Sequence, residues 1–219
     1  MLNREIINPS IPFLQAQDTV SQALLIMEDL KLTELPVIDH DIYLGLTFES
    51  DLLNEDESQL LQELSSRFST VSVNSAGHFL EAVQAVSEYQ LSVVPVVDAQ
   101  KHYLGSIGLY DLVQQLGKFN GAGDAGGIIV LEMDNRNFSF SEISKLVETN
   151  DARITHLNCQ RDPATDLLLV TLKLNKFEIS DIIATFQRYE YQIKFYFGEE
   201  LFENELRSNY QHLMNYLNI

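Results

Sequence analysis

Two aspartates, Asp51 and Asp111, have a placement in this sequence that suggests a binding function. Each follows a glycine by six residues, Asp51 after Gly45 and Asp111 after Gly105. An ionised carboxylate only accepts hydrogen bonds, so it suits a ligand that presents hydroxyl groups. A structural role is the alternative, because a carboxylate at the start of a helix stabilises the unpaired backbone N–H groups there.

The other residues that could carry chemistry form no catalytic or metal-binding motif. The five histidines are scattered, and no two are three or four residues apart: His40, His78, His102, His156 and His212. No metalloprotease, serine-hydrolase or dinucleotide-binding motif is present, so the sequence predicts a protein that is not an enzyme. The single cysteine, Cys159, excludes an internal disulfide, and its strand-like surroundings predict a half-buried packing residue.

Charge and composition narrow the class of partner. The chain has 219 residues, of which 45% are hydrophobic and 21% charged, as in ordinary globular proteins. Its 14 basic and 32 acidic residues give a net charge of −18, which argues against binding nucleic acid or an anionic membrane surface. The sequence shows no signal peptide and no apolar run long enough to cross a bilayer. A reducing cytoplasm is the expected location.

An internal repeat with a period of about sixty residues surrounds the two aspartates. Residues 35–53 align with residues 94–113 after one insertion, and a proline, two aspartates and a Tyr-Leu-Gly triplet coincide. Apolar residues at helical spacing precede each copy, over 20–30 and 79–89. The short apolar runs that follow predict strands covered by helices. Each copy therefore predicts a helix, two strands joined by a turn, and a second helix.

This duplicated pattern resembles a tandem pair of CBS domains. The resemblance implies two pseudo-symmetric β-α-β-β-α units, over residues 1–60 and 61–117, and an α/β fold. It also implies a non-enzymatic module that binds adenosine-containing ligands in clefts between the two units. Some members of the family bind divalent cations, and the pairs often form flat dimers.

The resemblance also assigns a ligand site. The family motif is a glycine, two apolar residues, a serine or threonine that helps to hold phosphate, and, three residues later, an aspartate that accepts hydrogen bonds from ribose. Here Phe48 and Gly108 stand at the hydroxyl position. Gly108 leaves room and a free backbone N–H, whereas Phe48 adds bulk, so the second site ranks above the first. The predicted ligand-binding residues are Asp111, Gly108, Val94, Pro95, Asp51, Leu35 and Pro36.

Charge favours ligands with little phosphate. Residues 1–116 hold four basic and 17 acidic residues, a net charge of −13. Adenosine, AMP or cationic S-adenosylmethionine therefore suits this half better than ATP, which needs several cationic or N–H partners. Magnesium is a separate option, because carboxylates supply its oxygen ligands, although acidic runs are usually solvated surface. The acidic candidates are Asp39, Asp41, Asp98, Glu49 and residues 55–57. No cofactor is obligatory, and no specific metal site is assigned.

The rest of the chain predicts a linker, a second domain and a tail. Residues 118–127 are glycine-rich, which predicts a flexible linker. Residues 128–198 show the order β-α-β-β-α-β, a ferredoxin-like α+β arrangement that resembles an ACT domain. Amino-acid-binding ACT domains usually have a glycine in the first strand–helix turn, which residues 134–138 lack, so dimerisation is the expected role. Residues 199–219 predict an amphipathic helix that packs on its own domain or between subunits.

The sequence thus predicts a regulatory protein similar to CBS/ACT proteins of the acetoin-utilisation type. Its CBS pair would bind AMP, adenosine or S-adenosylmethionine, and its ACT-like domain would form a homodimer or higher homo-oligomer. A separate output protein would read the bound state. Two alternatives remain: a homo-oligomeric scaffold that binds no ligand, and a divalent-cation sensor for magnesium.

Overall fold

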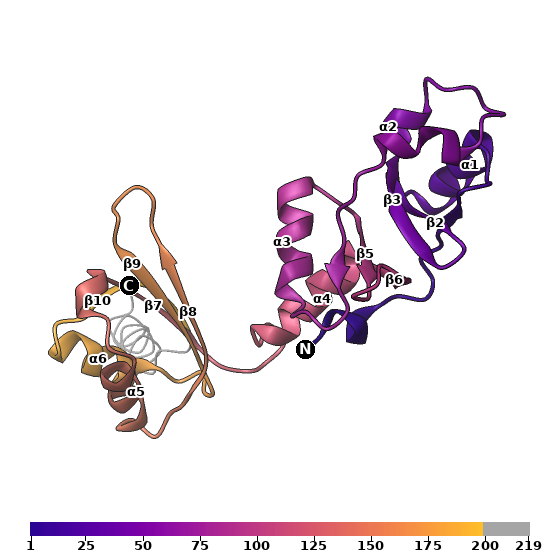
Figure 1. The fold of residues 1–219 in the computed structure, drawn as a ribbon. Coiled ribbons are helices and arrows are strands. Elements are labelled where there is room, and N and C mark those ends of the chain that lie inside the picture. Colours follow the sequence, from indigo (N-terminus) through magenta and orange to yellow (C-terminus); the bar gives the residue numbers. More distant parts are fainter. Residues whose placement is uncertain (199–219) are drawn as a thin grey trace, which may run out of the picture. The chain divides into compact units, whose positions relative to one another are not determined.

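The structure, a computed structural model, describes residues 1–198, so the helix predicted over 199–219 lies outside the described residues. The chain divides into two compact units, which meet in the sequence between Leu116 and Gly117 (Figure 1). Among the described residues, no helix is long and apolar enough to cross a membrane.

The first unit contains the same arrangement twice, as the repeat predicts. Its first half has the elements β1 (Leu14–Gln15), α1 (Val20–Leu30), β2 (Glu34–Asp39), β3 (Ile42–Phe48) and α2 (Glu49–Leu52). Its second half has β4 (Val73–Asn74), α3 (Leu80–Tyr89), β5 (Val93–Val97), β6 (Tyr103–Gly108) and α4 (Leu109–Phe119). The sheet orders β1-β2-β3 and β4-β5-β6 are equivalent, with one parallel and one antiparallel pair in each.

The predicted apolar stripes form the cores of the two halves. In α1, Val20, Ala23 and Met27 are buried, and Thr19 begins the helix by accepting a hydrogen bond from the Gln22 N–H. The second half has a separate core that includes residues of α3, β5 and α4. Burial of one face of each helix against a sheet explains why the helical spacing predicted these elements correctly.

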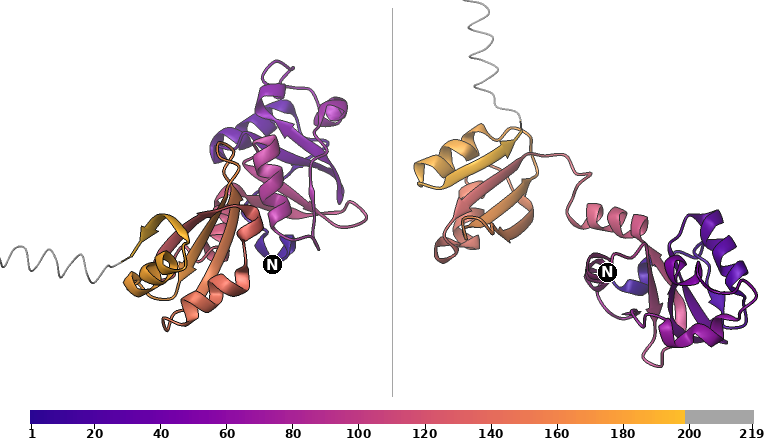
Figure 2. Two further views of the ribbon diagram at one scale, coloured as in Figure 1. Left: turned by 90° about the vertical axis from the view of Figure 1, so that its left-hand side faces the viewer. Right: turned by 90° about the horizontal axis from the view of Figure 1, so that it is seen from above.

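The N-terminal segment packs on the second half of this unit. Leu2 forms a β-bridge with His78, and Asn8 forms one with Ser106. A short 3-10 helix, η1 (Asn3–Ile6), lies between these two points, and Figures 1 and 2 show this indigo segment beside the second half. The start of the chain, which belongs to the predicted unit 1–60, therefore packs on the predicted unit 61–117.

The second unit is a four-stranded antiparallel sheet with two helices on one face. Its elements are β7 (Ile128–Met133), η3 (Asn135–Asn137), α5 (Phe140–Glu148), β8 (Ile154–Arg161), β9 (Leu168–Leu174), α6 (Ser180–Arg188) and β10 (Gln192–Phe197). The sheet order is β10-β7-β9-β8, and the core combines apolar residues of the sheet, α5 and α6. This is the ferredoxin-like arrangement, so the predicted α+β fold of residues 128–198 is confirmed.

Two local expectations were wrong. Cys159 is exposed rather than half-buried, because β8 is an edge strand of the sheet. The end of the glycine-rich segment is part of the second fold: Gly126 and Gly127 are buried, and the Gly127 N–H donates to the Lys176 carbonyl at 2.8 Å.

Candidate functional site

A cavity of about 480 Å³ lies around Asp111 in the first unit. Four segments contribute to it: the N-terminal segment, the turn after α1, the start of β5, and the junction of β6 with α4. Its lining residues are Asn8, Ile11, Leu32, Ser92, Val93, Gly108, Leu109, Tyr110, Asp111 and Val113. Most of them are apolar, and Asp111 is the only one that carries a charge at neutral pH.

The Asp111 carboxylate has one oxygen fixed and one available. Its Oδ2 accepts hydrogen bonds from Asn8 Nδ2 at 2.9 Å and from the Gly108 N–H at 3.3 Å. Within residues 1–198 its other oxygen, Oδ1, accepts no hydrogen bond that we identify. Asp111 lies in the first turn of α4, and the hydrogen bond from the Gly108 N–H to Oδ2 fits the structural interpretation.

Gly108 lies close to two side chains. A side chain here would place its Cβ 3.0 Å from Asp111 Oδ2 and 3.2 Å from Ile11 Cδ1, both closer than ordinary contacts. The expectation of a free Gly108 N–H was wrong, because this group donates to Asp111. The Asp111 carboxylate and the Ile11 side chain therefore each lie close to Gly108 at the wall of the cavity.

A buried carboxylate from the first half holds the β5 wall of the cavity. Glu34, at the start of β2, is only 1% exposed. Its Oε1 accepts hydrogen bonds from the Ser92 N–H at 2.5 Å, the Ser92 hydroxyl at 3.0 Å and the Val93 N–H at 2.8 Å. Its Oε2 accepts one from the Thr33 hydroxyl at 2.5 Å. Sequence analysis missed Glu34, although a glutamate beginning the apolar run Glu34–Ile38 was a visible anomaly.

The predicted site residues are only partly brought together. Asp111 and Gly108 line the cavity. Val94 and Pro95 do not, because they are buried further along β5, and Ser92 and Val93 line the cavity in their stead. The residues that the sequence did not identify, Asn8, Ile11 and Leu32, come from segments distant along the chain.

The equivalent position in the first half is built differently. Asp51 is exposed in α2 and makes no hydrogen bond or ion pair within the described residues. Leu35 and Pro36 are buried in β2, and Phe48 packs against the core of the second half. In this part of the structure Asp51 has no partner comparable to Asn8, so Asp111 is the better-organised of the two aspartates.

The acidic residues considered for magnesium are not gathered into a site. Within residues 1–198, no group of three or more His, Cys, Asp or Glu side chains is arranged to hold a metal ion. Asp39 and Asp98 instead lie at equivalent hairpin turns, each beside a histidine, at 3.0 Å from His40 and 2.8 Å from His102.

The turn at Asp98 predicts a dependence of stability on pH. The pKa of Asp98 lies below its usual value, chiefly because its carboxylate hydrogen-bonds the His102 side chain; backbone N–H groups of Gln100 and His102 contribute further. A lowered carboxyl pKa stabilises the fold above the unfolded-state value and loses this effect as the pH falls through the folded-state value. We expect His102→Ala to raise the Asp98 pKa towards 3.8, measured by NMR titration of the side-chain carboxyl. An unchanged pKa would contradict this assignment.

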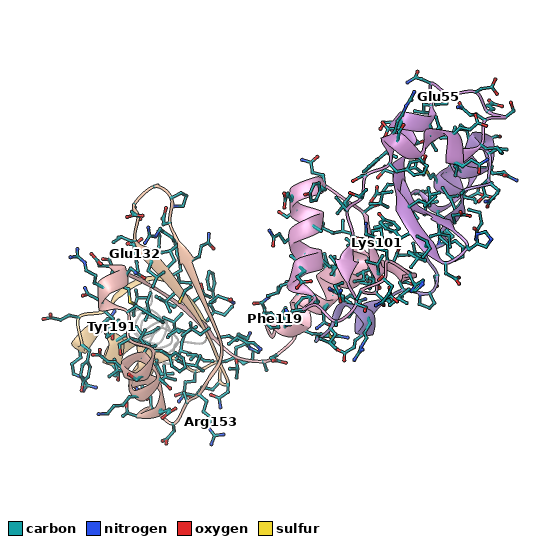
Figure 3. The ribbon with its side chains drawn as sticks, in the orientation of Figure 1. Glu55, Lys101, Phe119, Glu132, Arg153 and Tyr191 are labelled. Atoms are coloured by element: carbon teal, nitrogen blue, oxygen red, sulfur yellow. The ribbon has the colours of Figure 1, made fainter. Side chains whose placement is uncertain are left out.

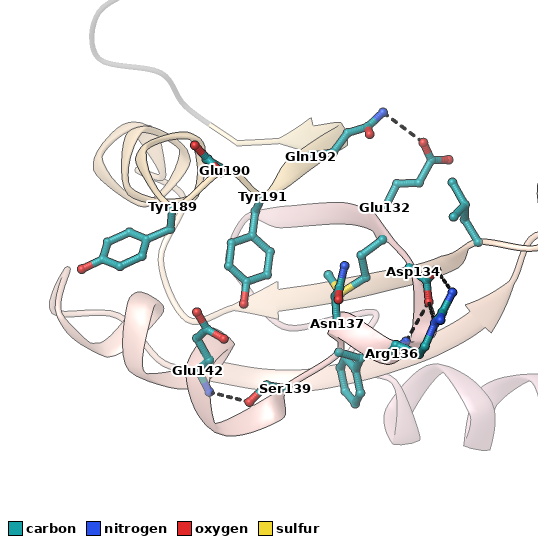
Figure 4. Close-up of a pocket in the computed structure, with 13 residues that line it drawn as sticks. Glu132, Asp134, Arg136, Asn137, Ser139, Glu142, Tyr189, Glu190, Tyr191 and Gln192 are labelled. Carbon is teal, nitrogen blue, oxygen red and sulfur yellow. Dashed lines mark hydrogen bonds and ion pairs between the residues drawn. The ribbon is translucent and has the colours of Figure 1, made fainter.

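A second cavity, of about 700 Å³, lies in the second unit between the turn after β7 and the turn after α6 (Figure 4). Glu132 and Tyr191, both labelled in Figure 3, contribute to its wall. Among its charged lining residues, Asp134 pairs with Arg136 at 3.3 Å, and Glu132 pairs with Lys194, which is outside the lining, at 2.8 Å. Burial, with the nearby Glu142 carboxylate, raises the pKa of Tyr191 to about 12. This cavity lies at the glycine-free turn of residues 134–138.

Comparisons with known proteins found one family model and several solved structures that are similar to part of this chain. The family model of the CBS domain matches residues 4–58. A CBS domain pair/ACT domain protein from Thermotoga maritima is 22% identical, with a TM-score of 0.50, over 54% of this chain and 98% of that chain. CBS domains of a transcriptional regulator from Streptococcus pneumoniae are 21% identical over 52% of this chain and 98% of that chain, with a TM-score of 0.46. The structure of CBSX2 in complex with AMP is 23% identical over 54% of this chain and 97% of that chain, with a TM-score of 0.44.

Proposed function

We propose that residues 1–117 form a CBS domain pair, and that this pair is a regulatory, non-catalytic module that binds an adenosine-type ligand in the cavity at Asp111. The observation that carries the proposal is the Asp111 carboxylate, which Asn8 holds through one oxygen while the other remains an available acceptor. Two adjacent ribose hydroxyls are suitable donors to such an acceptor. The apolar lining around it, including Ile11, Leu32 and Val93, suits a flat base.

The arrangement of the lining suggests how binding could change the protein. The cavity combines the N-terminal segment, a turn of the first half and two segments of the second half. A ligand there favours the arrangement of the halves that it binds more tightly, and it shifts the equilibrium only by that difference in affinity. For the ferredoxin-like unit we propose an ACT-like role in homodimer or homo-oligomer formation, with a separate protein reading the state.

The proposal is tested by ligand binding to the full chain. In a thermal-shift screen, adenosine, AMP or S-adenosylmethionine at 100 times its dissociation constant should stabilise the ligand-binding unit by about 2.7 kcal/mol. Asp111→Asn should weaken this ligand at least tenfold in calorimetry, because a ribose-accepting oxygen becomes an uncharged amide group. Asp51→Asn is the matched control, since it makes the same change at the equivalent position and should leave affinity unchanged.

The same screen can contradict the proposal. If none of the three adenosine compounds shifts the melting temperature, the CBS pair is a scaffold rather than a sensor of these ligands. If magnesium alone shifts it, a cation sensor is favoured instead. Equal losses in Asp111→Asn and Asp51→Asn would show that the cavity at Asp111 is not the site.

A further inference from the structure

We infer that Glu34 is a specificity-determining residue of the adenosine site, which selects against phosphate and for a neutral or cationic group at the ribose 5′ position. This inference rests on the proposed function. Glu34 does not itself line the cavity, but its carboxylate hydrogen-bonds directly to Ser92 and Val93, which do.

The contacts of the Glu34 side chain are all with hydrogen-bond donors. Both oxygens accept hydrogen bonds from N–H or hydroxyl donors, so the group acts entirely as an acceptor. Within the described residues no lysine, arginine or histidine forms an ion pair with it. Glu34 is therefore a buried acidic side chain that is held by N–H and hydroxyl donors and has no cationic partner within the described residues.

The cavity offers nothing to balance a phosphate. No basic residue is among its lining residues, and Asp111 adds a second carboxylate. Lys31 immediately precedes Leu32 in the chain, but it is exposed and does not line the cavity. The Ser92 and Val93 N–H groups, which could otherwise hold an anion, are already used by Glu34. An anionic ligand would meet two carboxylates and few available donors.

The size of the effect follows from Coulomb's law. At an effective dielectric constant of about 20, two unit charges roughly 10 Å apart interact strongly enough to change an affinity by about tenfold, before screening by salt. A dianionic phosphate is disfavoured, an uncharged 5′-hydroxyl is unaffected, and an ammonium or sulfonium is favoured. The structure thus favours adenosine and cationic adenosine derivatives over AMP.

The test compares three ligands that differ at the 5′ position: adenosine, 5′-amino-5′-deoxyadenosine and AMP. Their dissociation constants are measured by calorimetry for the wild-type chain, Glu34→Gln and Glu88→Gln. The glutamine at 34 keeps an oxygen that can accept from Ser92 and Val93 while removing the charge. Glu88 is exposed on α3 and does not line the cavity, so Glu88→Gln matches the change in net charge at another site.

We expect wild-type protein to bind the amine at least as tightly as adenosine, and adenosine more tightly than AMP. Glu34→Gln should improve AMP relative to adenosine about tenfold, and Glu88→Gln should leave that ratio unchanged. If adenosine binds but the ratio is the same in wild type and Glu34→Gln, the inference about Glu34 is overturned and the proposed function stands. If AMP binds wild type as tightly as adenosine, the inference is overturned without any variant. Binding of none of the three would overturn both.

Discussion

Replacing Glu34 by valine should lower the free energy of unfolding of the first unit by about 2–6 kcal/mol, because it removes the acceptor of two backbone N–H groups at the start of β5. Valine is the residue at the equivalent place of the second repeat, Val93, so it is acceptable to a strand of this kind. The variant would nevertheless leave the N–H groups of Ser92 and Val93 without their present acceptor, and each buried unsatisfied donor costs about 1–3 kcal/mol.

The measurement is urea denaturation of the full chain, with hydrogen exchange at the Ser92 and Val93 amides to assign the transition to the first unit. Glu34→Gln is the control that separates the hydrogen bonds from the charge, because it retains an acceptor oxygen and should cost about 1 kcal/mol. Exchange at the two amides should accelerate strongly in Glu34→Val only. Equal stability of the valine and wild-type chains would show that these hydrogen bonds do not hold the halves together.

The parts of the fold that could be predicted from the sequence are those encoded by local spacing. In α1 and α3, apolar residues three and four positions apart mark one buried face of the helix. In β9, apolar residues at every second position mark one buried face of the strand. Both patterns can be read without knowing which element packs against that face. The duplication then fixed the equivalence of the two halves. The ferredoxin-like order of the second unit followed from element order and short connections.

The cavity could be predicted only in part, because its walls come from residues far apart in the sequence. Asn8 and Asp111 are 103 positions apart, and Glu34 and Val93 are 59 apart. No periodicity connects such residues, so the N-terminal contribution was missed. Val94 and Pro95 were predicted at the ligand site, whereas the cavity meets β5 at its first residue, Val93, and at Ser92 before it.

The repeat contained one unused signal about the site. Aligning its copies places Glu34 opposite Val93, a charged residue against an apolar one within strands that are otherwise alike. In a buried strand such a difference requires a compensating set of donors, because an uncompensated carboxylate is costly to bury. The structure supplies them at Thr33, Ser92 and Val93. The difference between the repeats thus marks a residue whose burial depends on donors from the other half.

Gly126→Ala is expected to destabilise the second unit by at least about 3 kcal/mol, because the new methyl group has no room and the backbone conformation is unfavourable for it. Gly126 has a φ of +143°, and a Cβ there would lie far inside van der Waals contact, 1.7 Å from the Leu174 carbonyl oxygen. That oxygen belongs to the backbone at the end of β9, so it cannot move away like a flexible side chain. Relief of the clash would disturb the pairing of Ile128 with Lys173, where β7 and β9 begin to pair.

Gly123→Ala is the matched control from the same glycine-rich segment. Its Cβ would have no atom within 4 Å, so the alanine should change stability by less than about 0.5 kcal/mol, or stabilise slightly by restricting the unfolded chain. Urea denaturation followed by circular dichroism should show loss of stability in Gly126→Ala only, with hydrogen exchange in the first unit unchanged. Similar behaviour of both variants would mean that the segment up to Gly127 is a spacer, as its composition first indicated. A difference between them would place the structural start of the second unit before β7, at a glycine that composition alone had assigned to the linker.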